Sequence, residues 1–432
     1  MKLPLSETIM KTTLVVLLVL WTGIARASGF QVDVHDARAT AMATAMIAHV
    51  DDASATYYNP AGLITGRQLD IQVGDTLIVP SVNYKDANLS TSTEDRVIPP
   101  PHAYASYAIT EDVTLGLGYF SPYGLVVPWA SNWAGRYAII QTELKTYFIN
   151  PEVAFRIGDR VRLGGGIQII RATAELSRAL KFPGQTQDGR VDLAGGAWAA
   201  GGNAGVQVDI IPTMLTVGAT YRSAAELNIN GSAHFSNVPP EFQGTAHDQP
   251  AMTTAHLPAT FGVGIAYWPI PQLRLAFDAD YTGWQVVRNL TITFPGTPPT
   301  PPNTFGPLDT SLPKNWSHKW NYHLGGEYWV TDQWRVRAGI MYDPTPSPND
   351  TITPDLPDFD RVNIGAGAGY RYYGFNFDLG YQLIILTSNT STAIVPPPST
   401  LVSPRLTTAP RTSSPSPSAI GCDERLHCLS RD

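Results

Sequence analysis

The residues with the clearest capacity for chemistry form an apolar run between positions 122 and 133. The run contains Tyr123, Leu125, Val126, Val127, Pro128, Trp129 and Trp133. An apolar cluster of this kind in an exposed loop usually means that something hydrophobic binds there. The alternative is a loop that packs on itself. The chemistry that these residues indicate is binding of an apolar molecule.

The sequence lacks the patterns that mark common enzymatic sites. It has no GxSxG nucleophile elbow, no HExxH zinc motif and no glycine-rich phosphate loop. Single histidines such as His102, His247 and His323 are more often structural than catalytic. The two cysteines, Cys422 and Cys428, lie near the end of the chain, so the rest has no disulfide framework and no cysteine-based metal site. We expect no enzymatic activity, no metal and no cofactor.

Glycine and proline interrupt the segment just before the apolar run. The interrupting residues are Gly116, Gly118, Phe120, Ser121, Pro122 and Gly124. Proline cannot donate to a strand ladder, and glycine weakens one. We expect a kink or an opening in a sheet at Gly118, Phe120, Pro122 and Gly124. The alternative is an ordinary strand end that runs into a loop.

The elements that position these residues are predicted to be β-strands. From Leu273 to Tyr281, apolar residues alternate with Arg274, Ala276, Asp278 and Asp280, and this period of two is typical of a two-sided strand. The same reading gives thirteen strands along the chain, at 67–79, 100–109, 113–120, 138–156, 161–178, 190–210, 214–230, 257–267, 272–294, 316–330, 333–343, 360–371 and 375–387.

Three features favour an all-β transmembrane antiparallel barrel over a soluble sandwich. Trp and Tyr recur near strand ends on the apolar face, as in an interfacial girdle. The opposite face carries charges and glycines, which suits a lumen. Short turns alternate with long loops at about 80–99, 121–137, 179–189, 232–254, 295–315 and 344–359. The net charge of −7 argues against a nucleic-acid partner.

The first 27 residues read as a signal peptide. Lys2 and Lys11 supply positive charge, residues 13–21 are a short apolar core, and Ala25-Arg26-Ala27 is a cleavage site, so the mature chain starts at Ser28. An uncleaved N-terminal anchor is the alternative. An exported chain of this kind can enter a membrane if its strands close into a barrel.

Residues 28–66 lack strand alternation and are predicted to form a plug inside the lumen of a barrel at 67–387. The segment is rich in alanine, and Asn59-Pro60 is a turn signal. Asp51, Asp52, Asn59 and Pro60 are expected to fix the plug through hydrogen bonds and a turn rather than to contact ligand. A periplasmic extension is the alternative.

Residues 388–432 are Ser-, Thr- and Pro-rich and read as a disordered tail. Thirteen strands is an odd number, whereas bacterial single-chain barrels usually have an even one. Our hypothesis is that a frameshift has replaced the last strand. Translation of the other two reading frames beyond this point tests it.

Several segments carry a family resemblance. They are Ser28-Gly29-Phe30, DDASATYYNPAGL at 51–63, residues 122–125, residues 133–137 and residues 150–156. The chain resembles the FadL-type family of outer-membrane transporters of hydrophobic compounds from about 28 to 387. The resemblance implies a fourteen-stranded monomeric barrel with an N-terminal plug. Members take up long-chain fatty acids, and some branches take up aromatic hydrocarbons such as toluene.

The resemblance also implies a route for the ligand, and the chemistry of the residues themselves suggests which of them contact it. Ligand is captured at extracellular loops, passes to a lumen pocket and leaves sideways through a kinked third strand. Ligand-binding candidates are Phe30, Tyr123, Leu125, Val127, Trp129 and Trp133. A carboxylate would need a cation, for which the candidates are Arg136, Lys145, Arg171 and Arg337. The alternative for each is an ion pair with Asp or Glu in a polar lumen. Expected partners are hydrophobic small molecules, outer-membrane lipid and the barrel assembly machinery. A general porin or a structural barrel remains open as an alternative.

Overall fold

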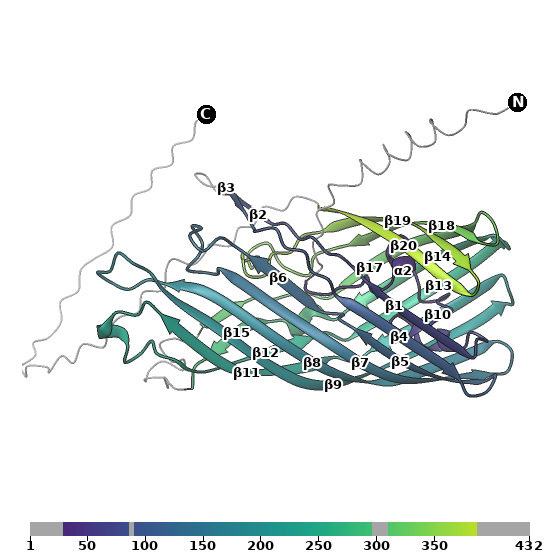
Figure 1. Ribbon diagram of the computed structural model, residues 1–432, viewed down its shortest axis with the longest axis horizontal. Coiled ribbons are helices and arrows are strands. Elements are labelled where there is room, and N and C mark those ends of the chain that lie inside the picture. The colour runs from purple at the N-terminus through teal and green to yellow at the C-terminus, as the bar shows by residue number, and fades with distance from the viewer. Residues whose placement is uncertain (1–28, 86–89, 296–309, 387–432) are drawn as a thin grey trace, which may run out of the picture. The chain divides into compact units, whose positions relative to one another are not determined.

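A computed structural model describes residues 29–85, 90–295 and 310–386, and antiparallel strands dominate it (Figure 1). The predicted signal peptide and the predicted tail lie outside these residues. The strands are β1 (Leu69–Asp75), β2 (Asn83–Lys85), β3 (Ser90–Ser92), β4 (Pro101–Ala108), β5 (Val113–Phe120), β6 (Gly124–Pro128), β7 (Gln141–Ile157), β8 (Val161–Leu180), β9 (Gly189–Ile211), β10 (Leu215–Arg222), β11 (Ala225–Ser236), β12 (Gln249–Leu257), β13 (Thr260–Ile270), β14 (Leu273–Thr282), β15 (Asn289–Thr293), β16 (Thr310–Pro313), β17 (Lys319–Trp329), β18 (Trp334–Asp343), β19 (Arg361–Tyr372) and β20 (Phe375–Leu386).

Antiparallel pairing between neighbouring strands joins most of them into one sheet, which forms the wall. β7 pairs with β8 and β8 with β9 along almost their whole length. At the two ends of the described wall, β1 pairs with β4 and β20 pairs with β19. Within the described residues no ladder joins β1 to β20. The missing last strand and its frameshift explanation therefore stay predictions.

The strand boundaries differ from the sequence-based ones in the long connections. Residues 232–254 and 295–315 were expected to be loops, yet β11 continues into the first, β12 begins there, and β16 lies in the second. The segments at 214–230 and 272–294 were expected to be continuous, and both are interrupted. The second interruption has a clear cause: Trp284 turns inward and is 1% exposed. Burial of this large ring outweighs continuation of the ladder.

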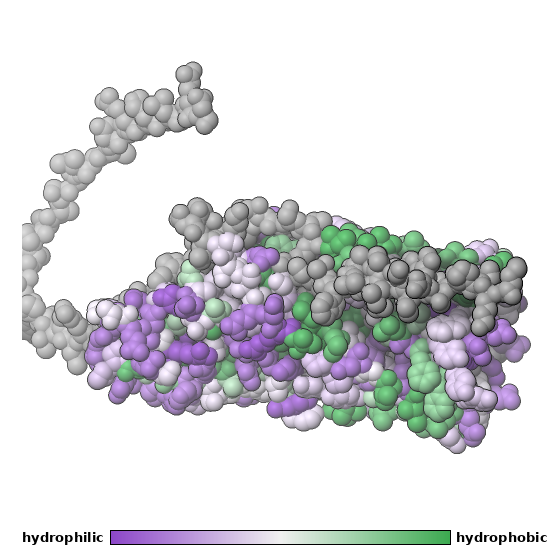
Figure 2. Space-filling model, turned by 45° about the horizontal axis from the view of Figure 1, so that its top comes forward, coloured by the Kyte–Doolittle hydropathy of each residue, from purple (hydrophilic) through white to green (hydrophobic). Residues whose placement is uncertain are grey.

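The wall is apolar outside and polar inside, the reverse of a soluble protein. On β17, Trp320, Tyr322 and Leu324 are exposed, whereas Asn321, His323 and Glu327 are buried. Figure 2 shows hydrophobic side chains gathered over part of the outer surface. This arrangement fits lipid outside and a polar lumen within. The predicted class, an all-β transmembrane barrel with an N-terminal plug, is confirmed.

The segment before β1 lies inside the wall. It contains helix α2 (Ala37–Ala41), helix α3 (Ala55–Tyr58) and the 3-10 helix η1 (Pro60–Leu63). The Asp36 carboxylate caps α2 by accepting a hydrogen bond from the Ala39 N–H at 2.8 Å. None of the described helices is long and apolar enough to cross a membrane.

Glycines on the inner face of the wall make room for this plug. A Cβ atom on Gly365 would lie 2.6 Å from the Ala41 carbonyl oxygen, and one on Gly164 would lie 2.5 Å from the Pro60 carbonyl carbon. Plug backbone atoms lie similarly close to Gly218, Gly325, Gly339 and Gly380, and plug side chains lie close to Gly116, Gly118, Gly205 and Gly264. The plug backbone therefore touches the strand backbone directly on many strands.

Replacing Gly339 by valine should displace the plug without preventing formation of the wall. Its side chain would overlap Met42 of the plug, and such overpacking costs about 1–3 kcal/mol. We expect higher ion conductance in planar bilayers, with heat-modifiable gel mobility retained. Gly326→Val is the control, because a Cβ there meets the Leu275 side chain at 3.4 Å, an ordinary contact. Equal conductance of the two variants would contradict direct contact between plug and wall.

Candidate ligand-binding cavity

An aromatic cluster forms where the plug begins. The Phe30 ring lies edge-on to Trp284, with ring centroids 5.0 Å apart, and 5.9 Å from both Trp316 and Tyr123. Phe148 extends the cluster on β7. Edge-on aromatic pairs of this kind are favourable packing. The plug start thus contributes an apolar anchor to the lumen, at the place where Phe30 was expected to contact a pocket.

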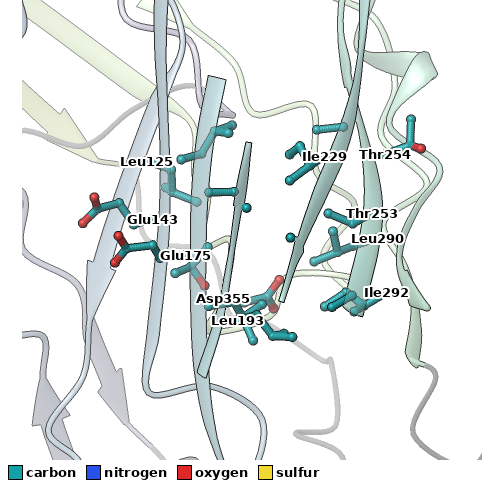
Figure 3. A pocket seen from close by; sticks show the side chains of 18 of the residues that line it. Leu125, Glu143, Glu175, Leu193, Ile229, Thr253, Thr254, Leu290, Ile292 and Asp355 are labelled. Carbon is teal, nitrogen blue, oxygen red and sulfur yellow. The ribbon is translucent and has the colours of Figure 1, made fainter. Parts of the chain in front are cut away.

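A cavity of about 150 Å³ adjoins this cluster. Phe30 lines one part of it, and Leu125, Leu144, Ile229 and Leu290 line others, from β6, β7, β11 and β15. Figure 3 shows the side chains of Ile229, Leu290 and Ile292 on the strands that face Leu125. The lining suits a hydrophobic molecule, since ligand pockets are mostly apolar with a few polar groups that fix orientation.

The wall is broken between β5 and β6. Both strands pair with β7, so that Phe120 faces Phe148 and Gly124 faces Lys145. Residues 121–123 therefore face only residues 146 and 147, which is the extra residue of a β-bulge. Pro122, which has no N–H to donate, lies in the bulge. The kink predicted at Gly118, Phe120, Pro122 and Gly124 coincides with this break.

The plug backbone fills the break. The Val32 N–H donates to the Pro122 carbonyl at 2.8 Å, and the Gly124 N–H donates to the Phe30 carbonyl at 2.8 Å. Gln31 and Tyr123 form an antiparallel bridge. A second cavity, of about 750 Å³, borders Gln31, Tyr123 and Leu125. The first described residues of the plug therefore stand between lumen space and the interruption in the wall.

The apolar segment at 122–133 is largely buried, because Gly124–Pro128 forms β6 and Trp129 and Trp133 pack with Ile139. Trp129 and Trp133 stack with centroids 4.4 Å apart and are 3% and 4% exposed. The Trp129 indole N–H donates to the Pro354 carbonyl at 3.1 Å, and that of Trp133 donates to the Ile139 carbonyl at 2.6 Å. Buried indoles need such partners. Val127 belongs to the same cluster, whereas Leu125 reaches the cavity.

The cations proposed from the sequence lie away from the side chains that line the smaller cavity. Arg136 pairs with Asp188 at 2.9 Å in the loops. Lys145 pairs with Glu143 and lines the larger cavity. Arg171 lies over the exposed ring of Trp198, 5.4 Å from its centroid. Arg337 is buried between Glu327 and Asp378, at 2.6 Å from each.

Residues that the sequence reading missed lie in segments that only the fold brings together. Lys314 and Asp355 line the cavity, and Trp284 and Trp316 pack on Phe30 beside it. These residues come from three segments of the chain that are separate in sequence. Trp284 and Trp316 were hidden because they interrupt segments expected to be regular strands or loops. Tryptophan inside a polar or irregular segment is the one signal that could have pointed to them.

Charged and amide side chains hold the plug at its other end. Arg38 lies 2.6 Å from Asp51 and 3.0 Å from Asp52, and Arg274 of β14 lies 3.2 Å from Asp51. Burial acts to raise the pKa of Asp51, but Arg38 and Arg274 hold that pKa well below its usual range. The Asn59 amide donates to the Ile47 carbonyl at 2.8 Å and to the Val206 carbonyl of β9 at 3.2 Å. The plug is thus tied both to itself and to the wall.

A family model described as outer membrane protein transport protein (OMPP1/FadL/TodX) matches residues 18–395. The chain belongs to this family. Membership assigns outer-membrane transport of hydrophobic compounds and places the chain in the bacterial outer membrane as a transporter rather than an enzyme.

Similarity to individual members of the family is moderate and extensive. The chain is 26% identical over 356 residues to a long-chain fatty acid transport protein of Salmonella typhi, covering 74% of this chain and 79% of that protein. It is 25% identical to the Escherichia coli K12 protein of the same name, with the same coverage. A crystal structure of a Pseudomonas aeruginosa FadL homologue gives a TM-score of 0.70 at 21% identity, covering 83% of this chain and 92% of that one. The Pseudomonas putida toluene transporter TodX gives 0.59 at 16%, covering 82% and 94%. The two structures show a shared fold.

Asn59→Ala should make the barrel leakier while the barrel itself stays folded. The change removes amide bonds to the plug and to β9, each worth about 1 kcal/mol. We expect increased permeation of a hydrophilic antibiotic into cells, with unchanged heat-modifiability on gels. Pro60→Ala, in the adjacent turn, should act in the same direction.

The matched control is Asn230→Ala. The Asn230 amide donates only locally, to Asn228 on an exposed strand position. If neither Asn59→Ala nor Pro60→Ala differs from this control, the turn is merely a linker.

Proposed function

We propose that this chain lets hydrophobic compounds cross the outer membrane passively by a lateral route. Ligand is captured beside the loop that carries Trp129 and Trp133, enters the cavity lined by Phe30 and Leu125, and leaves through the wall at residues 121–123. The proposal makes residues 28–66 the plug that controls this exit.

The observation that carries the proposal is the plug backbone in the wall break. Among the described residues, the backbone hydrogen bonds that join Phe30 and Val32 to Gly124 and Pro122 fill the place beside residues 122–124 where a neighbouring strand would pair. A hydrophobic ligand that displaced these few bonds would pass from an apolar cavity toward lipid without entering water. The hydrophobic effect favours entry of the ligand into the cavity and opposes its escape into water.

A general porin fits the lumen less well. A porin needs an open polar channel, whereas the plug meets glycines on many strands and the adjoining cavity is apolar. The apolar outer face of the wall supports the proposed contact with outer-membrane lipid. Insertion by the barrel assembly machinery and a monomeric state remain proposals that follow from the family.

Two ligand chemistries are open for this route. Long-chain fatty acids are expected from the resemblance, and two relatives at 25–26% identity carry that name. Aromatic hydrocarbons are the second candidate, and the fold is shared with a toluene transporter. The same lateral path serves either chemistry.

Uptake by cells with and without the gene tests the transport itself. We expect the gene to raise the initial uptake rate of labelled oleate or of labelled toluene, because both are apolar enough to partition into the cavity. The host should lack its own transporters of this family. Equal uptake in both strains for every apolar compound tried would remove the proposed function.

A reversible crosslink tests the exit. Gln31→Cys with Tyr123→Cys, in a background where Cys422 and Cys428 are serine, places two thiols at bridged positions, where a disulfide is geometrically feasible. Oxidation should lower uptake to the level of cells without the gene, and reduction should restore it.

The control pair is Val73→Cys with Ala103→Cys, which are partners between β1 and β4 inside the wall. Oxidation of the control pair should leave uptake unchanged. Full transport by the oxidised Gln31–Tyr123 variant would show that the ligand leaves elsewhere.

A further inference from the structure

A buried ion pair lies at the smaller cavity, the one of about 150 Å³. Lys314 follows β16, and Asp355 lies in the connection between β18 and β19. The Lys314 ammonium is 2.8 Å from the Asp355 carboxylate and donates to the Thr353 hydroxyl at 2.5 Å. The two residues are 1% and 6% exposed, and both line the cavity. The ammonium therefore has an anionic partner before any ligand arrives.

Other charged residues at the cavity turn their side chains away from it. Glu143 is next to Leu144, and Glu175 lies between Ala174 and Leu176. The side chains of Leu144, Ala174 and Leu176 face the lumen. Because side chains alternate along a strand, both carboxylates lie on the other face. Figure 3 shows Glu143 and Glu175 pointing away from Ile229 and Leu290 across the cavity. His256 lies between Ala255 and Leu257 of the apolar cluster and is turned outward for the same reason.

Arg222 does not supply a cation to this cavity either. Its guanidinium lies over Tyr57 and Phe120, 4.8 Å and 5.3 Å from their ring centroids, and donates to the Tyr57 carbonyl at 2.8 Å. Arg222 is not among the residues that line the cavity. Among the described residues, the cation whose side chain reaches the cavity is Lys314.

We propose that Asp355 is a specificity-determining residue that makes this cavity select uncharged ligands and reject carboxylates. This inference rests on the proposed function and concerns the same cavity. A carboxylate entering here would lose its hydration and find the ammonium already neutralised, with a second carboxylate beside it. Burial of a charge without its own partner is strongly unfavourable.

The volume agrees with this selection. At about 150 Å³, the cavity has the size at which a dry apolar cavity takes up one benzene ring. An uncharged single-ring compound satisfies both the charge and the size of the site. A fatty acid would need the Lys314–Asp355 pair to open first.

The test uses toluene and benzoate, which share a ring and differ in charge. Binding to the full chain in lipid nanodiscs is followed by tryptophan fluorescence, because Trp284 and Trp316 adjoin the cavity. We expect the wild-type chain to bind toluene at least tenfold more tightly than benzoate at pH 7. Asp355→Asn, which frees the ammonium for a ligand carboxylate, should reduce that ratio at least tenfold.

Two further variants protect the test from a folding failure. Lys314→Met with Asp355→Leu removes both charges and should keep the wild-type ratio, since the site stays neutral. Asp188→Asn breaks the ion pair with Arg136 in the loops and should also leave the ratio unchanged.

The outcomes separate this inference from the proposed function. Equal binding of toluene and benzoate by the wild-type chain overturns the inference alone, as does an unchanged ratio in folded Asp355→Asn. If Asp355→Asn does not fold, the inference is tested by the ratio of toluene to benzoate affinity in the wild-type chain and in the double variant. A ratio near one in either of them overturns it. Absence of binding by both compounds also overturns the inference, whereas the proposed function is overturned separately, by equal uptake of oleate and toluene in cells with and without the gene.

Discussion

The close approach of the plug backbone to the inner wall is the constraint on which the rest of the structure depends. Side chains at Gly164, Gly339 or Gly365 would overlap the plug, so glycine at these positions lets a segment of ordinary residues occupy the lumen. With the plug in place, Phe30 reaches Trp284 and Trp316, and residues 30–32 reach the wall break. Without it, the lumen would be a wide polar channel with an unfilled gap.

Ion pairs complement this steric fit at the far end of the plug. Glu327 of β17 lies among Arg38, Arg274 and Arg337, and Arg38 in turn contacts Asp51 and Asp52. Buried charges of this kind contribute little net stability, but loss of one partner is costly. We infer that they specify one position of the plug, while the few backbone bonds at residues 30–32 leave the start of the segment easier to displace. A plug held firmly at one end and lightly at the exit suits a gate.

Much of the fold follows from the sequence because a lipid-facing wall enforces strict alternation. Leu273 to Tyr281 and Trp320 to Tyr328 read correctly as strands, since each outward residue must be apolar and each inward one can be polar. The alternation fades beyond the lipid, so the sequence does not mark β12 and β16 as strands. Trp284 breaks its strand for a tertiary reason, contact with Phe30, which no local pattern reveals.

The site was less predictable than the fold. The sequence suggests Phe30 because it lies at the start of the plug, and Leu125 because it belongs to an apolar run. It suggests an interruption at Pro122 because proline has no N–H to donate. The cation was not predictable, because Arg136, Lys145 and Lys314 look equally suitable in the sequence. Only the fold shows that each has an acidic partner and that, of the three, Lys314 lines the smaller cavity. Lys314 and Asp355 are 41 residues apart in the sequence, so no local pattern reveals that they form an ion pair.

The central claim is that a plugged wall admits an apolar ligand to one cavity beside the exit. A crystal structure of the full chain with bromobenzene would test this claim most directly. We predict an anomalous bromine peak between Phe30, Ile229 and Leu290, with residues 37–63 inside the wall. A bromine peak confined to the outer surface, or a lumen empty of residues 37–63, would contradict it.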